Sequence, residues 1–315
     1  MREDLSPRQP SKYPPVNLFL LGSAYCGSTH LGGLIAANFD AVYAGETARL
    51  PAFVESLRLY DHPASCYLCG TRGHLECPVW TEEAVHAVQA AGPVAGTAEL
   101  RRRTGAPVIV DGSKFPEWLR RSSAGEPADQ ASVAAVLLVR SPFEYVVSAT
   151  SATGQPTWVT AQWWRDVYVD GLRTVARASI PFAIIRNEDI RSHPGRALRS
   201  IGALVNQPVP DQLRPAEPTH SLGGNLWVQL GYSRDTLSYF SALGVPHDER
   251  AHTDAEWAEV AAQKSTTAAN RPSDVESALA MMQSVVDTPG LHDLAELLGY
   301  QLVREMHTFA EGAGR

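Results

Sequence analysis

Lysine is scarce in this chain of 315 residues. Only Lys12, Lys114 and Lys264 occur among 27 basic residues, and the others are arginines. The 34 acidic residues leave a formal net charge of −7, and the sequence contains no lysine-rich run. An acidic chain without a basic stripe is a poor binder of nucleic acid. The composition therefore argues against a nucleic-acid partner, and it draws attention to any lysine that lies inside a motif.

Long apolar runs are also missing. No run approaches the roughly 20 residues that a membrane-spanning helix needs, so we expect no membrane partner. The polar, proline-rich start MREDLSPRQPSKYPP lacks the apolar segment of a secretory signal. We expect residues 1–14 to form a loose arm and the body of the protein to be cytoplasmic, where disulfides are disfavoured.

Short apolar runs alternate with segments of helical composition. Hydrophobic residues make up 44% of the chain, which is enough for a well-buried core. The apolar runs, each typical of a buried parallel strand, are Val16–Leu21, Val108–Val110, Ala134–Val139 and Phe182–Ile185. The intervening helical segments are Leu50–Tyr60, Thr81–Ala91 and Trp163–Ala178. This alternation predicts an α/β fold with a parallel sheet flanked by helices.

The chain shows no internal repeat, and one domain with insertions is the simplest organisation. We place this domain at residues 15–303 and a C-terminal tail at 304–315. Its expected parts are a Cys-rich insertion at 62–80, a proline-rich loop at 206–225, a polar segment at 244–273 that could act as a lid, and final helices at Val275–Val286 and Leu291–Leu298.

A loop rich in small residues follows the first apolar run. It begins at Gly22 and ends in Cys26-Gly27-Ser28-Thr29, where a helical segment starts. A strand, a small-residue loop and a helix N-terminus form a P-loop-like cradle for anions, because the loop and the helix end present N–H groups. The loop is not a Walker A motif, since no lysine precedes Ser28. The alternative reading is an ordinary strand-to-helix turn.

Two further strand ends carry cations. Asp111-Gly112-Ser113-Lys114 follows the second apolar run, and Arg140 follows the third, with Ser148 eight residues later. Ligands of open α/β sheets bind at the carboxyl ends of strands, so these side chains are expected to reach one crevice. The alternatives are a solvated lysine that pairs with Asp111 and a structural arginine.

Taken in order, these motifs resemble sulfotransferases that use 3′-phosphoadenosine 5′-phosphosulfate (PAPS). The first loop resembles the family's 5′-phosphosulfate loop, and Arg140 with Ser148 resembles its 3′-phosphate clamp. Further similarities are Gly45-Glu46, the stretch Ile185-Arg186-Asn187-Glu188-Asp189-Ile190, and His220-Ser221-Leu222-Gly223-Gly224-Asn225. The resemblance implies a sulfotransferase or P-loop NTPase-like fold, with PAPS as co-substrate. The cofactor-binding residues it implies are Tyr25, Cys26, Gly27, Ser28, Thr29, Arg140, Ser148, Gly224 and Asn225.

The sequence departs from the family pattern at several positions. Tyr25 stands where a basic residue is usual, Cys26 replaces a serine and His30 replaces a leucine. Asn187 stands in place of a tyrosine, and Leu226-Trp227-Val228 lacks an arginine that is often found there. These departures bear on the affinity for the donor.

The resemblance implies transfer of a sulfuryl group to a hydroxyl, or less favourably an amine, of a small molecule, with a natural product as one acceptor class. Lys114 is expected to stabilise the leaving phosphate. A general base must take the acceptor's proton, and Glu46 is the first candidate, His30 the second and His220 the third. The alternatives are a divergent P-loop kinase and a non-catalytic binder of adenosine bisphosphate. The sequence names neither the acceptor nor the oligomeric state.

A separate cluster of cysteines lies in the insertion. Cys66 and Cys69 have the spacing of metal ligands, and His74 with Cys77 could complete a tetrahedral Cys3His zinc site. Buried free thiols or a disulfide between Cys66 and Cys69 are the alternatives. Cys26 is not expected to bind metal.

Overall fold

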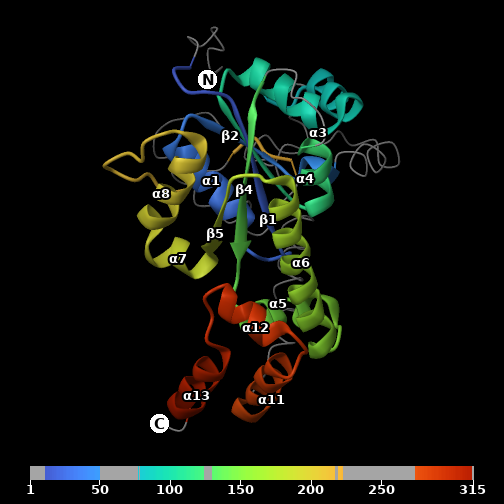
Figure 1. The fold of residues 1–315 in the computed structure, drawn as a ribbon, viewed down its shortest axis with the longest axis vertical. Helices are drawn as coiled ribbons and strands as arrows, with labels where there is room; N and C mark the ends of the chain where they lie inside the picture. Colours follow the sequence, from blue (N-terminus) through green and yellow to red (C-terminus); the bar gives the residue numbers. More distant parts are fainter. Residues whose placement is uncertain are drawn as a thin grey trace, which may run out of the picture.

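The computed structural model describes residues 11–49, 77, 79–123, 130–216, 219–222 and 274–313. A five-stranded sheet forms the centre of this part of the chain (Figure 1). The strand order is β2–β3–β1–β4–β5, and every pair of neighbouring strands is parallel. The strands are β1 (Val16–Gly22), β2 (Ala41–Gly45), β3 (Val108–Lys114), β4 (Ser132–Val139) and β5 (Phe182–Arg186). The expected α/β class with a parallel sheet is confirmed.

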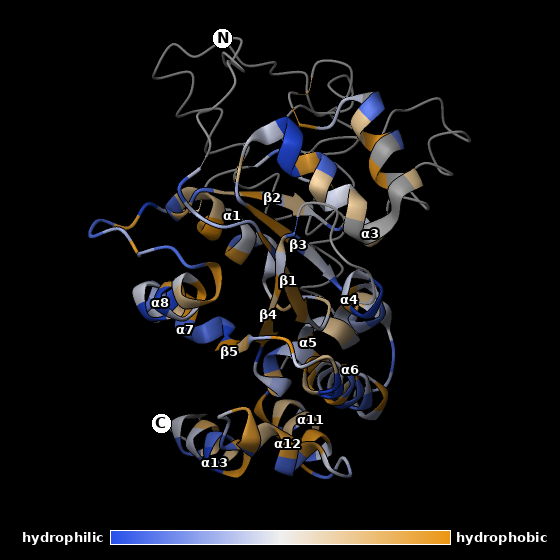
Figure 2. Cartoon of the chain, turned by 45° about the horizontal axis from the view of Figure 1, so that its top comes forward, coloured by the Kyte–Doolittle hydropathy of each residue, from blue (hydrophilic) through white to orange (hydrophobic). Residues whose placement is uncertain are grey.

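The central strand β1 is buried along its whole length, and its side chains alternate between two apolar layers. Phe19 and Leu21 face one layer, whereas Leu18 and Leu20 face the other. This double burial explains why the strand is a continuous apolar run. In Figure 2 the strands accordingly form an orange band between helices of mixed colour.

Helices cover both faces of the sheet (Figure 1). One face carries α1 (Ser28–Asn38), α7 (Asn187–Ser192) and α8 (Pro194–Val205). The other face carries α4 (Pro116–Ser123), α5 (Pro142–Thr153) and α6 (Thr157–Ala178), and α11 (Val275–Val286) and α12 (Leu291–Leu297) pack against α6. Helix α3 (Glu82–Thr104) packs over β2 and β3, a short 3-10 turn η1 (Thr47–Arg49) follows β2, and α13 (Leu302–Ala313) is the last helix described.

Helix termini follow the local sequence. Pro142 occupies the first turn of α5, where its missing N–H costs no hydrogen bond. Thr81 caps α3 by accepting a hydrogen bond from the amide of Ala84, and the helix ends at Gly105 in the left-handed conformation.

The structure differs from the sequence prediction in four places. Strand β2 was not predicted, because Ala41–Gly45 is short and only partly apolar. Strand β3 extends to Lys114, four residues beyond the apolar run. Helix α3 continues through Pro93 to Thr104, and most of the expected tail belongs to α13. The predicted helix Leu50–Tyr60 and the lid segment 244–273 lie outside the described residues.

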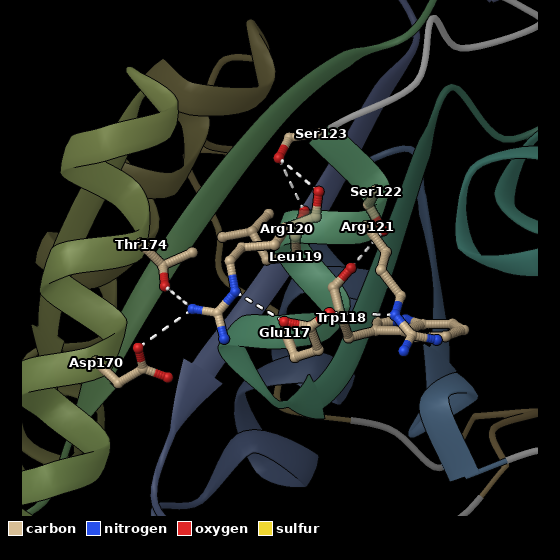
Figure 3. A network of polar contacts seen from close by, with 9 residues as sticks. All are labelled: Glu117, Trp118, Leu119, Arg120, Arg121, Ser122, Ser123, Asp170 and Thr174. Carbon is tan, nitrogen blue, oxygen red and sulfur yellow. Dashed lines mark hydrogen bonds and ion pairs between the residues drawn. The ribbon is translucent and has the colours of Figure 1, made fainter.

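A polar surface lies between α4 and α6 (Figure 3). Arg120 donates hydrogen bonds to Glu117 (2.9 Å), Asp170 (3.2 Å) and Thr174 (2.7 Å). A cavity of about 270 Å³ lies here, and its lining includes Arg173 and Arg177. The C-terminal end of α6 lines the cavity and leads into the start of β5. The cavity is therefore remote from the carboxyl ends of the strands. Its ion pairs are exposed and contribute little stability.

None of the helices in the described part of the chain combines the length and the apolar character that a bilayer crossing requires.

Candidate functional site

The loop between β1 and α1 (residues 23–27, the β1–α1 loop) has a fixed and unusual backbone. Tyr25 and Gly27 both have positive φ angles, of 61° and 92°. A Cβ at Gly27 would lie 2.0 Å from the side-chain nitrogen of Asn187, so only glycine fits this close approach. The first turn of α1 contains no acidic residue. The positive end of the helix dipole is therefore not offset by a local carboxylate.

Lys114 is the last residue of β3, and its side chain points toward the β1–α1 loop. Its Nζ atom forms an ion pair with Oε1 of Glu46 and lies 3.4 Å from Oγ of Ser28, at the start of α1. The ammonium also donates to the carbonyl of Gly112 at 3.2 Å. The alternative in which Lys114 pairs with Asp111 is wrong, because Glu46 is its acidic partner.

Arg140 approaches the same loop from the opposite flank. It follows β4, and its Nη1 donates to the carbonyl of Tyr25 at 3.0 Å, while its Nε donates to Glu144 at 3.0 Å. Since β1 lies between β3 and β4, the loop after β1 is flanked by the cations that follow its two neighbours. Arg140 therefore contacts the loop at Tyr25, and Lys114 contacts the adjoining start of α1 at Ser28. Ser148 lies half-buried on α5, one turn beyond Glu144.

Glu46 lies immediately after β2. It is buried, with 4% of its surface exposed. Gly45 has a φ of 85° and forms a parallel bridge with Leu222, whose backbone would clash with any side chain at Gly45. The amide of Glu46 donates to the carbonyl of Leu222 at 2.5 Å. The segment 219–222, which includes His220, thus lies beside the candidate base.

Asp111 joins the two segments that carry Glu46 and Lys114. This buried carboxylate accepts hydrogen bonds from the Thr47 hydroxyl, from the amide and hydroxyl of Ser113, and from Nε1 of Trp118. Burial raises the pKa of Asp111, and the four donors oppose this shift. The hydroxyl of Ser113 also accepts from the amide of Ala48 at 3.0 Å. This network fixes the end of β3 against the turn after Glu46.

The stretch Arg186–Asp189 connects three parts of the site. The amide nitrogen of the Asn187 side chain donates to the carbonyl of Cys26, and Oδ1 of the same side chain is buried with no hydrogen-bond partner among the described residues. Glu188 accepts from the amide of Ser141 and from the hydroxyl of Tyr300, both at 2.8 Å. The stretch that resembles the family pattern therefore connects the β1–α1 loop, the turn after Arg140 and the C-terminal helices through hydrogen bonds.

Two titratable groups of α1 and its loop are strongly affected by burial. Burial lowers the pKa of His30, and the positive charge of Arg191 lowers it further. Burial raises the pKa of the Cys26 thiol. A raised pKa keeps this thiol in its less reactive, protonated form.

Only part of the predicted zinc site falls on described residues, since Cys66, Cys69 and His74 lie outside them. Cys77 is buried and not in a disulfide, and its Sγ lies 3.5 Å from Nδ1 of His220. Two ligands of a tetrahedral zinc ion would lie about 3.6 Å apart at ordinary bond lengths. Within the described ranges no three metal-ligating side chains come together. The predicted nucleotide-binding residues Gly224 and Asn225 also lie outside the described part.

Sequence reasoning missed several residues that contact the site: Trp118, Glu144, Asn187 and Arg191. Only Asn187 gave a signal, because it lies in a stretch that had been singled out. Trp118 and Glu144 contact Asp111 and Arg140, which are near them in sequence, whereas Arg191 approaches Glu144 from a distant segment.

No family model and no curated protein matches the sequence. Among solved structures, the chain is similar to the sulfotransferase domain of the olefin synthase of Synechococcus PCC 7002, with 18% identity and a TM-score of 0.45 over 73% of this chain and 98% of that one. It is also similar to the sulfotransferase domain of the curacin biosynthetic pathway, with 17% identity and a TM-score of 0.45 over 81% and 99%. A sulfotransferase from Alicyclobacillus acidocaldarius matches with 16% identity and a TM-score of 0.34 over 74% and 97%. The function is therefore argued from the residues of this chain.

Proposed function

We propose that the chain transfers a sulfuryl group from PAPS to a hydroxyl of a small-molecule acceptor. An amine is the less favoured nucleophile. The observation that supports this most is the β1–α1 loop with a cation on each flank, Lys114 at Ser28 and Arg140 at Tyr25. A donor with phosphate groups at its 5′ and 3′ positions requires two separated cationic contacts of this kind.

The donor would lie with its 5′-phosphosulfate over the start of α1. There the first-turn amides and the hydroxyls of Ser28 and Thr29 would bind the oxygens, and glycine at position 27 would allow close approach. The 3′-phosphate would bind Arg140, which can contact it in a bidentate manner. Ser148 on α5 would contribute a hydroxyl to that phosphate.

In the reaction, the acceptor oxygen attacks sulfur in line as the bond from sulfur to the bridging oxygen breaks. The products are a sulfate ester and adenosine 3′,5′-bisphosphate. Negative charge grows on the bridging oxygen, next to the position of Lys114. A preorganised ammonium stabilises this charge without having to reorganise solvent.

Glu46 would take the proton that the acceptor hydroxyl loses. Its carboxylate is buried and in contact with the Lys114 ammonium, which compensates its charge in the absence of substrate. When the donor arrives, Lys114 can turn toward the bridging oxygen and leave Glu46 available as base. One lysine thereby couples donor binding to the release of the carboxylate.

The experiment is transfer of labelled sulfate from PAPS to a panel of small-molecule hydroxyls and amines. Sulfated product together with adenosine 3′,5′-bisphosphate supports the proposal. Binding of the bisphosphate without transfer to any acceptor would favour the non-catalytic binder, an alternative that the replacement of a basic residue by Tyr25 supports. Preferential binding and turnover of ATP with magnesium would contradict the proposal and favour a kinase.

A further inference from the structure

Two guanidinium groups converge on one carboxylate oxygen beside the β1–α1 loop. Oε2 of Glu144 lies 3.0 Å from Nε of Arg140 and 4.0 Å from Nη2 of Arg191. Arg140 belongs to the segment after β4, whereas Arg191 belongs to α7, the helix that follows β5. The contact therefore brings together cations from two neighbouring strand ends.

Arg191 also lies close to the start of α1. Its charge acts on His30, which is in the first turn of that helix and half-buried. The guanidinium is thus within electrostatic reach of both the Glu144 carboxylate and the α1 N-terminus.

Glu144 occupies a specific place within the expected phosphate clamp. It contacts Arg140, which precedes α5, and it lies four residues before Ser148 on the same face of that helix. The carboxylate therefore lies between the two residues that are proposed to hold the 3′-phosphate. Its 42% exposed side chain can rotate toward solvent.

We propose that Arg191 is a further binding residue for the 3′-phosphate of the donor, and that Glu144 holds the phosphate position until the nucleotide binds. This inference rests on the proposed function, because it assigns residues to the donor of that reaction. The family pattern often has an arginine where this chain has Leu226-Trp227-Val228. Arg191 would supply a second guanidinium for the 3′-phosphate in its place.

The charges favour an exchange of one anion for another. In the ligand-free chain, Glu144 neutralises part of the charge of two arginines. A phosphate with up to two negative charges would replace it, since a phosphate offers three oxygens where Glu144 offers one to both arginines. The carboxylate would then leave, because two anions at one position repel each other.

The test measures the dissociation constants of adenosine 3′,5′-bisphosphate and adenosine 5′-monophosphate by titration calorimetry. The variants are Arg191→Ala, Glu144→Gln, the double variant and Arg140→Ala. Arg199→Ala on α8 is the matched control, because it removes an exposed arginine of the adjacent helix.

We expect Arg191→Ala to weaken bisphosphate binding about fivefold or more, in the wild-type and in the Glu144→Gln background, and to leave monophosphate binding unchanged. Glu144→Gln is expected to tighten bisphosphate binding about threefold or more.

Three results would overturn the inference about Arg191. The first is that Arg191→Ala binds the bisphosphate as tightly as Arg199→Ala does. The second is that its loss of bisphosphate affinity disappears in the Glu144→Gln background. The third is that it loses affinity equally for the monophosphate. Unchanged or weaker bisphosphate binding by Glu144→Gln would overturn the role of Glu144. If the wild-type protein does not prefer the bisphosphate, the proposed function fails as well. If that preference exists and only Arg140→Ala removes it, the present inference alone fails.

Discussion

The ammonium of Lys114 contacts the carboxylate of Glu46 in a nearly closed environment. The side chains of the two residues are 12% and 5% exposed. The same ammonium lies 3.4 Å from the hydroxyl of Ser28. One cation thus connects the candidate base to the loop that is proposed to bind the donor.

We predict that Glu46→Gln lowers the rate of sulfate transfer about 10²- to 10⁴-fold, the usual contribution of a general base. Bisphosphate affinity should stay within about threefold, because the glutamine does not touch the donor. Full activity in steady-state assays would eliminate Glu46 as the base.

This substitution also breaks a buried ion pair, so its stability must be measured in parallel. We expect a loss of about 1–3 kcal/mol in the free energy of unfolding, less than for a fully isolated pair because Lys114 keeps its contacts with Ser28 and Gly112. The double variant Glu46→Gln with Lys114→Met should recover part of this stability and remain inactive. A double variant that is both stable and active would refute the mechanism.

Asp111→Asn is predicted to destabilise the fold by about 2–4 kcal/mol, because an amide group would face one of the four donors that now point at the carboxylate. Urea denaturation measures this change. Asp170→Asn, at an exposed side chain, serves as control and should change stability by less than about 0.5 kcal/mol. Equal effects of the two substitutions would show that the Asp111 network does not hold the site.

His30 is predicted to make the protein less stable in mild acid. Its pKa is lower in the folded state than its ordinary value of 6.5, so below pH 6.5 the unfolded chain binds this proton more readily than the folded chain. Stability therefore falls as the pH falls from 6.5 toward the folded-state value. The midpoint of thermal unfolding should drop less between pH 7.5 and 5.5 for His30→Gln than for the wild type. The exposed His307→Gln should behave like the wild type, and identical pH profiles for all three would contradict the prediction.

The zinc hypothesis predicts about one zinc per chain in protein expressed with added metal, and loss of that zinc in Cys77→Ser. Elemental analysis measures the content. Comparing His74→Ala with His220→Ala identifies the nitrogen ligand, because His220 is the histidine in contact with Cys77. Metal-free wild-type protein, with a thermal midpoint unchanged by a chelator, would remove zinc from the account.

The sequence predicted four strands because each contains an apolar run, which is buried on both faces in β1 and stays apolar in β5 although Phe182 and Ile184 are exposed. Strand β2 was not predicted because Ala41–Gly45 is short and weakly apolar. Its pairing with β3 is a long-range contact that no local sequence pattern encodes. For the same reason the sequence did not place Glu46, the first candidate base, at the end of a strand. The end of β3 was missed because Asp-Gly-Ser is polar in sequence, although these residues pack inside the hydrogen-bond network of Asp111.

The candidate site was predictable where function requires a residue type at a strand end. Lys114 and Arg140 are examples, because the order of parallel strands brings their ends to one edge. Arg191 and Glu144 were not predictable, since neither lies in a recognisable motif and their proximity depends on how the ends of β4 and β5 bring α7 and the start of α5 together. The contact of Asn187 with the β1–α1 loop was not predictable either, because it joins two segments that are distant in sequence.

The central claim is that one crevice, with the β1–α1 loop as its floor and Lys114 and Arg140 on its flanks, binds both phosphates of one adenosine nucleotide. Titration calorimetry of the wild type and Arg140→Ala with adenosine 3′,5′-bisphosphate, and with ATP and magnesium, tests it most directly. We predict that the wild type prefers the bisphosphate and that Arg140→Ala loses about 2–5 kcal/mol of its binding free energy. An unchanged dissociation constant in Arg140→Ala, or tighter binding of ATP by the wild type, would contradict the account.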